Sequence, residues 1–406
     1  MKRRQLLKRT ALLSASGLAA VGTHGWAWRN PAQAAARTPR LIVILLRGAV
    51  DGLNVLVPYQ EANYYELRPT IAIVPPGTAA AALDLDGQFG LHPALSALMS
   101  EWQAGHLAFV HASGSPVSVR SHFQAQADLE TGTPGVDTTP DGWLNRLLAF
   151  LPTGTTTQAV SVGGTLPLIF SGPKSVASVA LGRAGTLPLP TDQPQIQAAF
   201  DRLYANDSRL AQVYQAGRAA RDVVMQALND EMMAASRGAL DPSQFATSAQ
   251  YLARLMVGDA ATQVAFMELG QWDTHVNERD ILNRHLDALG AGLATLATAL
   301  GPVYRDTAVV VMSEFGRTVA ENGNGGTDHG YGNALWLMGG SLKGAQVYGE
   351  WPGLATANLY QSRDLAVTTD FRDVLSALLA QHFSLSEPAL AQIFPGYRAQ
   401  KTFQFL

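Results

Sequence analysis

The stretch "TAVVVMSEFGRTVAENGNGGTDHGYGNA", residues 307–334, joins a hydrophobic run to a loop rich in glycine and polar side chains. The β-branched residues at its start predict a buried strand. Glu314 and Arg317 follow directly, and the glycine-rich loop then brings in Asp328 and His329. We therefore expect a strand that serves as scaffold and a loop whose side chains do chemistry.

Three further hydrophobic runs have the same character: "LIVILL" at 41–46, "LAFVHA" at 107–112 and "QVAFMEL" at 263–269. Amphipathic patterns that predict helices lie at 92–105, 142–151, 279–301 and 370–383. Asp141 and Asp370 are the expected N-caps of the second and the last of these helices. Strands that alternate with helices indicate an α/β fold with a mostly parallel sheet.

Each predicted strand is followed by polar residues that suit catalysis or metal binding. In chain order these are Asp51, then Ser121 and His122, then Asp273 and His275, and finally Glu314 and Arg317. The carboxyl ends of parallel strands meet at one edge of a sheet, where ligand sites form. We therefore expect the four strand ends to build one site, over which the loop with Asp328 and His329 folds back.

Two of these residues have the spacing of metal ligands. Asp273 and His275 are two apart, so in an extended segment both side chains point to the same side. A carboxylate and an imidazole suit Zn²⁺ or Mn²⁺, with Ca²⁺ as a further candidate. Asp273 could instead cap the helix that follows, and Asp51, within "VDGLN", could be a plain turn aspartate.

Ser121 is a candidate nucleophile with a structural alternative. It opens "SHFQ", which matches the capping box of a helix N-terminus. Such an N-terminus favours anions, and Arg120 lies beside it, so capping and catalysis are compatible. His122 is a candidate metal ligand or general base.

The fourth strand end and the glycine-rich loop each have two interpretations. Glu314 can bind a metal and Arg317 can clamp a tetrahedral anion, or the two can simply pair with each other. Asp328 and His329 are either metal ligands or chance members of a flexible loop. We favour the functional interpretation, because acids and histidines recur at all four strand ends.

Composition narrows the classes of protein. The 406 residues are 47% hydrophobic, enough for one large domain or two to three ordinary ones. Charged residues make up 15% and the net charge is −3, so no basic stripe argues for nucleic acid binding. The absence of cysteine excludes disulfides, thiolate nucleophiles and iron–sulfur clusters.

Residues 1–36 are expected to be an export signal. They have a basic start, a short apolar middle and small-residue cleavage sites in "PAQAAA". "RRQLLK" at 3–8 resembles the twin-arginine signal, whose translocase exports folded proteins; an ordinary secretory signal or a short anchor is the alternative. We expect the mature chain, 37–406, to be a single periplasmic domain without a stable membrane span, since no later stretch looks apolar enough for one.

Several motifs together resemble a known family. "LRGAVDGLN", "RSHFQAQ", "GWLNR", "WDTH" and "SEFGRT…NGNGGTDHGYGNA" occur in that order. Over Arg40 to Phe394 the chain resembles the exported domain-of-unknown-function family numbered 1501 (DUF1501), which is placed in the alkaline phosphatase and sulfatase superfamily. The resemblance implies a doubly wound, mostly parallel sheet with helices on both faces and a metal site at the strand ends.

The resemblance also implies roles for single residues. Asp51 stands at the position of the first metal-binding aspartate. Asp273 and His275 resemble a ligand pair after a central strand, and His329 resembles the final histidine ligand. Ser121 lies near the position of the nucleophile.

The fourth strand departs from the superfamily pattern. Glu314-Phe315 stands where Asp-His is usual, and a phenylalanine cannot bind metal. Either one of two metals is missing, or His122 or Asp328 compensates. Residues 190–257 carry amphipathic patterns and are expected to form a helical insertion, as a small cap or packing arm.

The sequence supports two hypotheses of function. The first is a metal-dependent hydrolase of phosphate or sulfate esters, acting on a small-molecule or polymer substrate. Its nucleophile would be Ser121 or a water, and Arg317, with Arg120, would neutralise the developing charge. The second is a non-catalytic exported binding or assembly protein with a degenerate metal site, which the Glu314-Phe315 departure favours.

Overall fold

The computed structural model describes residues 38–152, 157–163, 166–179 and 236–406. The expected signal at 1–36 and most of the expected insertion, 190–235, lie outside these residues. Pro39–Leu406 forms one compact unit.

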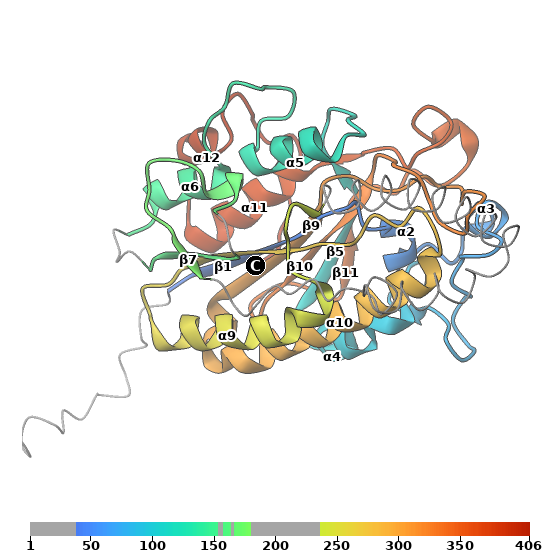
Figure 1. Cartoon of the computed structure of the whole chain (residues 1–406), viewed down its shortest axis with the longest axis horizontal. Coiled ribbons are helices and arrows are strands. Elements are labelled where there is room, and N and C mark those ends of the chain that lie inside the picture. Colours follow the sequence, from blue (N-terminus) through green and yellow to red (C-terminus); the bar gives the residue numbers. More distant parts are fainter. Residues whose placement is uncertain (1–37, 153–156, 164–165, 180–235) are drawn as a thin grey trace, which may run out of the picture. The chain divides into compact units, whose positions relative to one another are not determined.

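A nine-stranded sheet lies at the centre of this unit (Figure 1). Its strands follow the order β11-β5-β10-β9-β1-β8-β6-β7, and β12 also pairs with β5. The bounds are β1 Arg40–Leu46, β5 Leu107–Gly114, β6 Ala159–Val162, β7 Ala177–Val179, β8 Val264–Leu269, β9 Thr307–Ser313, β10 Asn333–Met338, β11 Gln346–Tyr348 and β12 Thr369–Asp370. Among these described strands β10 alone runs antiparallel to its neighbours, so the sheet is mostly parallel.

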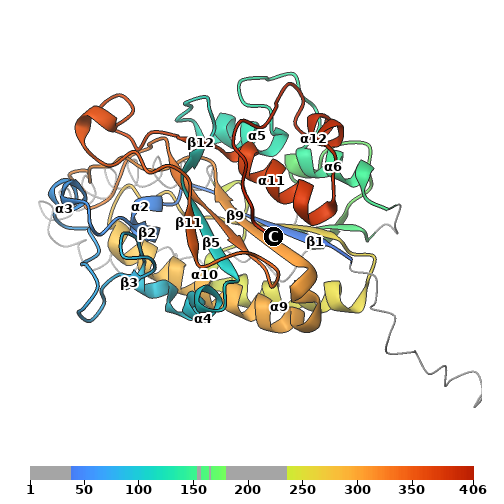
Figure 2. The same ribbon diagram turned by 180° about the vertical axis from the view of Figure 1, so that it is seen from behind.

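Helices cover both faces of the sheet (Figures 1 and 2). On one face lie α4 Met99–Gln103, α9 Phe245–Gly258 and α10 Glu278–Leu300; on the other lie α5 His122–Thr131, α6 Trp143–Leu147, α11 Phe371–Phe383 and α12 Glu387–Ile393. Two short helices, α2 Gly52–Val55 and α3 Ala62–Leu67, flank a small sheet of β2 Leu56–Val57, β4 Gly90–Leu91 and β3 Leu83–Asp84. The predicted doubly wound α/β class is confirmed.

The central strand β1 explains why two helical layers form. Every residue of "LIVILL" is fully buried, and successive side chains of a strand point to opposite faces. Ile42, Ile44 and Leu46 join the core under α9 and α10, while Leu41, Val43 and Leu45 join the core under α6 and α11. A strand apolar on both faces therefore requires cover on both sides.

The four predicted strands are present, and the helices differ from prediction in detail. The pattern at 92–105 divides into a 3₁₀ turn, Pro93–Leu98, and α4. Helix α6 begins after Gly142 rather than Asp141, so the predicted aspartate cap does not form. Residue 142 must be glycine, because a Cβ there would lie 2.0 Å from the carbonyl oxygen of Ile169. Asp370 caps α11 as predicted, accepting from the backbone N–H of Arg372.

Helix α9 lies in the described end of the expected insertion. It packs against α10, with Phe245, Leu252 and Met256 fully buried in the main core. The described end of the region thus belongs to the helical layer of the sheet rather than to a separate cap.

Helix α10 with the turn after it, Glu278–Asp306, is long and apolar enough to cross a membrane by length and composition. The sequence predicted this helix at 279–301, but the expectation that no later stretch is apolar enough to span a membrane did not foresee that it passes this test. Its leucines, among them Leu282, Leu286 and Leu293, are buried in the core against the sheet and α9. The apolar stripe is explained by this packing.

Candidate metal centre

Four side chains meet beyond the carboxyl ends of three strands. His122 is the first residue of α5 and follows β5. Asp273 and His275 follow β8, and His329 lies in the glycine-rich loop after β9. The parallel strand ends and the loop thus bring together residues 207 positions apart in sequence.

The ring nitrogens of the three histidines converge on one carboxylate. The Nε2 atom of His329 lies 2.9 Å from Nε2 of His122 and 3.0 Å from Nε2 of His275. Oδ1 of Asp273 lies 3.0 Å from Nε2 of His275 and 3.3 Å from Nε2 of His329. Its Oδ2 lies 3.5 Å from Nε2 of His122.

These separations fit a bound metal ion. Zn²⁺ bonds to nitrogen and oxygen at about 2.0–2.1 Å, which puts tetrahedral ligand atoms about 3.3 Å apart. The five separations run from 2.9 to 3.5 Å. Among the described residues, His122, Asp273 and His329 offer ligand atoms that all lie within 4.8 Å of one another, and His275 lies 3.0 Å from two of them. Oδ2 of Asp273 is buried, and its contact with Nε2 of His122 is long at 3.5 Å, which leaves this oxygen able to bind a ligand.

Each histidine is also held at its other nitrogen. The distances from Nδ1 are 2.8 Å for His122 to Oε1 of Glu314, 3.3 Å for His275 to Oδ1 of Asp328, and 2.9 Å for His329 to the carbonyl oxygen of Arg120. A neutral imidazole that donates from Nδ1 carries its lone pair on Nε2. All three lone pairs therefore point into the space that a metal would occupy.

The charges of the site are strongly coupled. Burial opposes ionisation of Asp273, but hydrogen bonds from the three histidines and the charge of Arg317 hold its pKa well below the usual range. Burial acts to lower the pKa of His122, yet its hydrogen bonds to Asp273 and Glu314 prevail and raise it to about 9. A metal that binds here must displace a proton from this cluster.

Glycines let the loop that carries His329 pack against the strand ends. A Cβ at Gly326 would lie 2.4 Å from the backbone of His275, and one at Gly330 would lie 2.3 Å from the backbone of Arg317. Neither approach is open to a residue with a side chain. The loop is therefore seated on the backbone of the site.

Glu314 and Asp328, both predicted as ligands, lie one layer behind the cluster. Glu314 is buried, and its Oε1 accepts from His122, from the backbone N–H of Gly48 at 2.8 Å and from Gln126 at 2.9 Å. Asp328 contacts the far side of His275. Both carboxylates orient imidazoles, so in this geometry they are not metal ligands.

The structure does not bring Asp51 into the cluster. Both of its oxygens accept hydrogen bonds from the buried guanidinium of Arg68, and Oδ1 also caps α2 through the N–H of Leu53. Burial opposes ionisation, but Arg68 holds the pKa of Asp51 below its usual range. In this structure Asp51 therefore caps a turn and pairs with Arg68, and it does not stand among the candidate metal ligands.

Arg317 is not free to clamp a substrate either. Its side chain is buried and donates to Oδ1 of Asp273 at 2.6 Å and to the carbonyl oxygens of Ala49, Gly48, Trp272 and Thr327. The guanidinium orients Asp273 instead. The alternative prediction, an ion pair between Arg317 and Glu314, is also not found, because Arg317 pairs with Asp273.

Ser121 occupies the N-cap position of α5, but its side chain makes no capping hydrogen bond. The residue is exposed and lies next to His122 in the chain. The predicted capping box is therefore not formed, and the hydroxyl is left available at the rim of the cluster.

Sequence reasoning missed the residues that support the cluster, Gln126, Arg363 and Asp364, and also Arg68, which holds Asp51. Arg363 donates to the carbonyl oxygen of His329 at 2.5 Å and pairs with the buried Asp364, which also binds Arg120 at 2.6 Å. A signal existed only for Gln126, which is four residues after His122 and thus on the same face of the helix.

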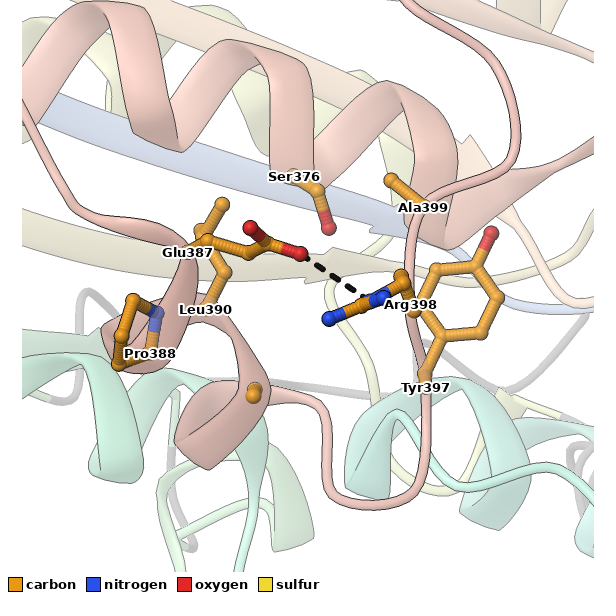
Figure 3. A pocket seen from close by; sticks show the side chains of 8 residues that line it. Ser376, Glu387, Pro388, Leu390, Tyr397, Arg398 and Ala399 are labelled. Carbon is orange, nitrogen blue, oxygen red and sulfur yellow. Dashed lines mark ion pairs between the residues drawn. The ribbon is translucent and has the colours of Figure 1, made fainter.

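A cavity of about 400 Å³ lies elsewhere, between α11, α12 and the C-terminal segment (Figure 3). Glu387 and Arg398 form an exposed ion pair of 3.1 Å across it. Its other lining residues are Ser376, Pro388, Leu390, Ala391, Tyr397 and Ala399. It shares no residue with the candidate metal centre.

Fold and cluster together define an α/β protein with a candidate centre of three histidines and one carboxylate. The chain belongs to the DUF1501 family, a family of proteins of unknown function whose profile matches residues 38–394. The resemblance found in the motifs is thereby confirmed. No curated protein matches the chain significantly.

Solved structures similar to this chain come from the alkaline phosphatase and sulfatase group. One is a protein of the alkaline phosphatase superfamily from Vibrio parahaemolyticus, which is 12% identical with a TM-score of 0.40. The alignment covers 85% of this chain and 66% of the Vibrio chain. A 2-O GAG sulfatase is 11% identical, with a TM-score of 0.40 and coverages of 90% and 76%. The lipoteichoic acid synthase LtaP from Listeria monocytogenes is 9% identical, with a TM-score of 0.36 and coverages of 79% and 68%. This chain thus spans less than two thirds of the Vibrio protein.

Proposed function

We propose that this chain is a metal-dependent hydrolase of phosphate or sulfate esters that works with one divalent ion in the cell envelope. The observation that carries the proposal is the convergence of three Nε2 atoms on Asp273, with every Nδ1 held by an acceptor. Imidazole and carboxylate ligands favour Zn²⁺, with Mn²⁺ second. Such an ion would supply Lewis-acid activation of an ester oxygen.

The surroundings favour one ion rather than two. Asp51, the expected ligand of another ion, is paired with Arg68 inside the fold. Phe315 packs its ring 4.9 Å from the ring of His122 and 5.2 Å from that of His329, and offers no donor atom. His122, Asp273 and His329, with His275 beside them, thus offer ligand atoms for a single ion.

Two arginines remain to meet an anionic substrate group. Arg120 and Arg363 are partly exposed and share Asp364 as an anchor. Ser121, exposed at the start of α5, or a water is the nucleophile of this proposal.

Location in the envelope rests on the leader sequence. Its paired arginines, Arg3 and Arg4, suit export of a folded, metal-loaded chain by the twin-arginine translocase. Replacement of both by lysine should leave the precursor in the cytoplasm. Normal export of that double variant would refute export by the twin-arginine translocase and would leave the proposed hydrolase activity untested by this experiment.

A substrate panel tests the activity. The zinc-loaded full chain is assayed with p-nitrophenyl phosphate, bis-p-nitrophenyl phosphate and p-nitrophenyl sulfate, beside His329→Ala and the control His106→Ala, whose side chain pairs with Glu101. We expect at least one ester to be hydrolysed by the wild type and the control but not by His329→Ala. A metal-loaded wild type inert toward the whole panel would overturn the proposal.

One observation favours a second candidate, a non-catalytic exported binding or assembly protein. Arg317, which was expected to bind the substrate anion, donates its hydrogen bonds to Asp273 and to backbone carbonyls instead. In that case the metal would stabilise the strand ends without turnover. A chain that holds zinc, hydrolyses none of the three esters and co-purifies with one stable partner would support this candidate.

A further inference from the structure

Helix α5 presents a polar stripe to the interior. His122, Gln126 and Glu130 recur every four residues and are 5%, 0% and 0% exposed. At this spacing the side chains lie above one another on one face of the helix. A buried polar stripe is costly unless every member is hydrogen-bonded, so the stability of this face depends on its partners.

The stripe is bonded to the ends of β1, β8 and β9. Gln126 donates from its amide to Oε1 of Glu314 at 2.9 Å and accepts at Oε1 from Arg47 at 2.7 Å. Arg47 also pairs with Glu130 at 2.8 Å and with Glu268. The result is a buried chain of hydrogen bonds that runs from Arg47 through Gln126 and Glu314 to Nδ1 of His122.

Gln126 has chemistry that its neighbours lack. It must donate to a carboxylate on one side and accept from a guanidinium on the other, and a side-chain amide does both. Its donor and that of His122 meet the same oxygen of Glu314, and both residues lie on one face of α5. The amide therefore fixes where this carboxylate stands relative to the imidazole.

We propose that Gln126 is a positioning residue that couples Arg47 to Glu314 and thereby holds His122 with its Nε2 lone pair directed at the metal. The inference rests on the proposed metal centre and adds that its affinity is set from the buried face of α5. Residues that orient metal ligands typically change metal affinity by about 10–100-fold when they are lost.

Two variants and a matched control test this on the full chain. Gln126→Met removes both hydrogen bonds at similar volume. Gln126→Glu keeps the acceptor for Arg47 but turns the donor toward Glu314 into a second carboxylate. Gln124→Met makes the same change two residues away, where the half-buried side chain binds Asp128 and Asp137.

Zinc affinity is measured by competition with a chromophoric chelator, and the Nδ1–H proton of His122 is observed by NMR without metal. We expect both Gln126 variants to bind zinc about 10–100-fold more weakly and to shift or lose the Nδ1–H signal, with Gln124→Met unchanged in both. Folded Gln126 variants with wild-type affinity and an unchanged signal would overturn the inference. If the wild type binds no zinc, the proposed function fails, and the imidazole signal alone still decides the role of Gln126.

Discussion

The Nε2 atoms of His122 and His329 lie 2.9 Å apart. Both rings hold an acceptor at Nδ1, so in their neutral forms two lone pairs face each other. That arrangement is repulsive unless the two rings share a proton or a metal ion. One divalent ion shared with His275 and Asp273 is the cation that we propose for the loaded protein.

Replacement of His329 by alanine should abolish tight metal binding. His329 contacts all three other members of the cluster, so its loss leaves no complete ligand set. We expect zinc affinity to fall by well over the 10–100-fold typical of a residue that only orients a ligand. Competition against a chelator measures it, and the His106→Ala variant should bind as the wild type does.

Replacement of Asp51 by asparagine tests whether this residue stabilises the fold or binds metal. The change leaves the buried Arg68 without its counter-charge, so we expect the free energy of unfolding to fall by about 3–5 kcal/mol. Metal affinity should stay unchanged, because Asp51 lies outside the cluster. Loss of bound metal from a folded Asp51→Asn variant would show that this aspartate is a ligand after all.

Arg317→Met should act through Asp273 and stability rather than through substrate binding. It removes a buried partner of the carboxylate together with four donations to backbone carbonyls. We expect a loss of about 3–5 kcal/mol in urea unfolding. Arg317→Lys should recover only part of it, since an ammonium cannot reproduce the planar fork. A fully stable Arg317→Met chain with weakened substrate binding would restore the clamp role.

Glu278→Gln should become increasingly favourable as pH rises. Burial raises the pKa of Glu278 well above its usual range, and Asp51 raises it further while Arg68 opposes. The folded state therefore keeps a proton that the unfolded chain releases above about pH 4.3, and wild-type stability falls with rising pH by up to about 1.4 kcal/mol per unit until the folded pKa is reached. Glutamine cannot ionise.

Unfolding by urea at about pH 4.5, pH 6 and pH 8 checks this prediction. The difference in unfolding free energy between Glu278→Gln and the wild type should shift toward the variant at each step. Glu278 binds Thr274 and Asn54, contacts that an amide can largely keep. A difference that does not change with pH would mean that Glu278 is ionised in the fold.

The scaffold and most of the cluster were predictable from the sequence, because both depend on local patterns. A short, β-branched run such as "LIVILL" favours a strand buried on both faces, and parallel strands place the residues after them on one edge. That rule is enough to predict that His122, Asp273, His275 and His329 lie close together. Strand β10 was not predicted, although "ALWLM" is apolar and buried. Its antiparallel direction depends on its pairing with β5 and β9, which no local pattern encodes.

The roles within the site depend on contacts that no local pattern encodes. Asp51 looks like a ligand until Arg68, 17 residues later, is seen to occupy both its oxygens. Arg317 looks like a free clamp until the carbonyls beyond β1 and β8 take its donors. The imidazole of His122 lies between Glu314 and the candidate metal site. This arrangement depends on how α5 packs against the strand ends, which the sequence around Glu314 does not encode.

The most direct test is the metal content of the full chain, folded in its native host, gel-filtered without chelator and measured by mass spectrometry. One equivalent of zinc or manganese per chain, retained in Asp51→Asn and lost in His329→Ala, is the predicted result. Two equivalents would mean that Asp51 or Glu314 binds a second ion. A chain without bound metal would leave the convergence of three histidines on Asp273 unexplained and would contradict the account.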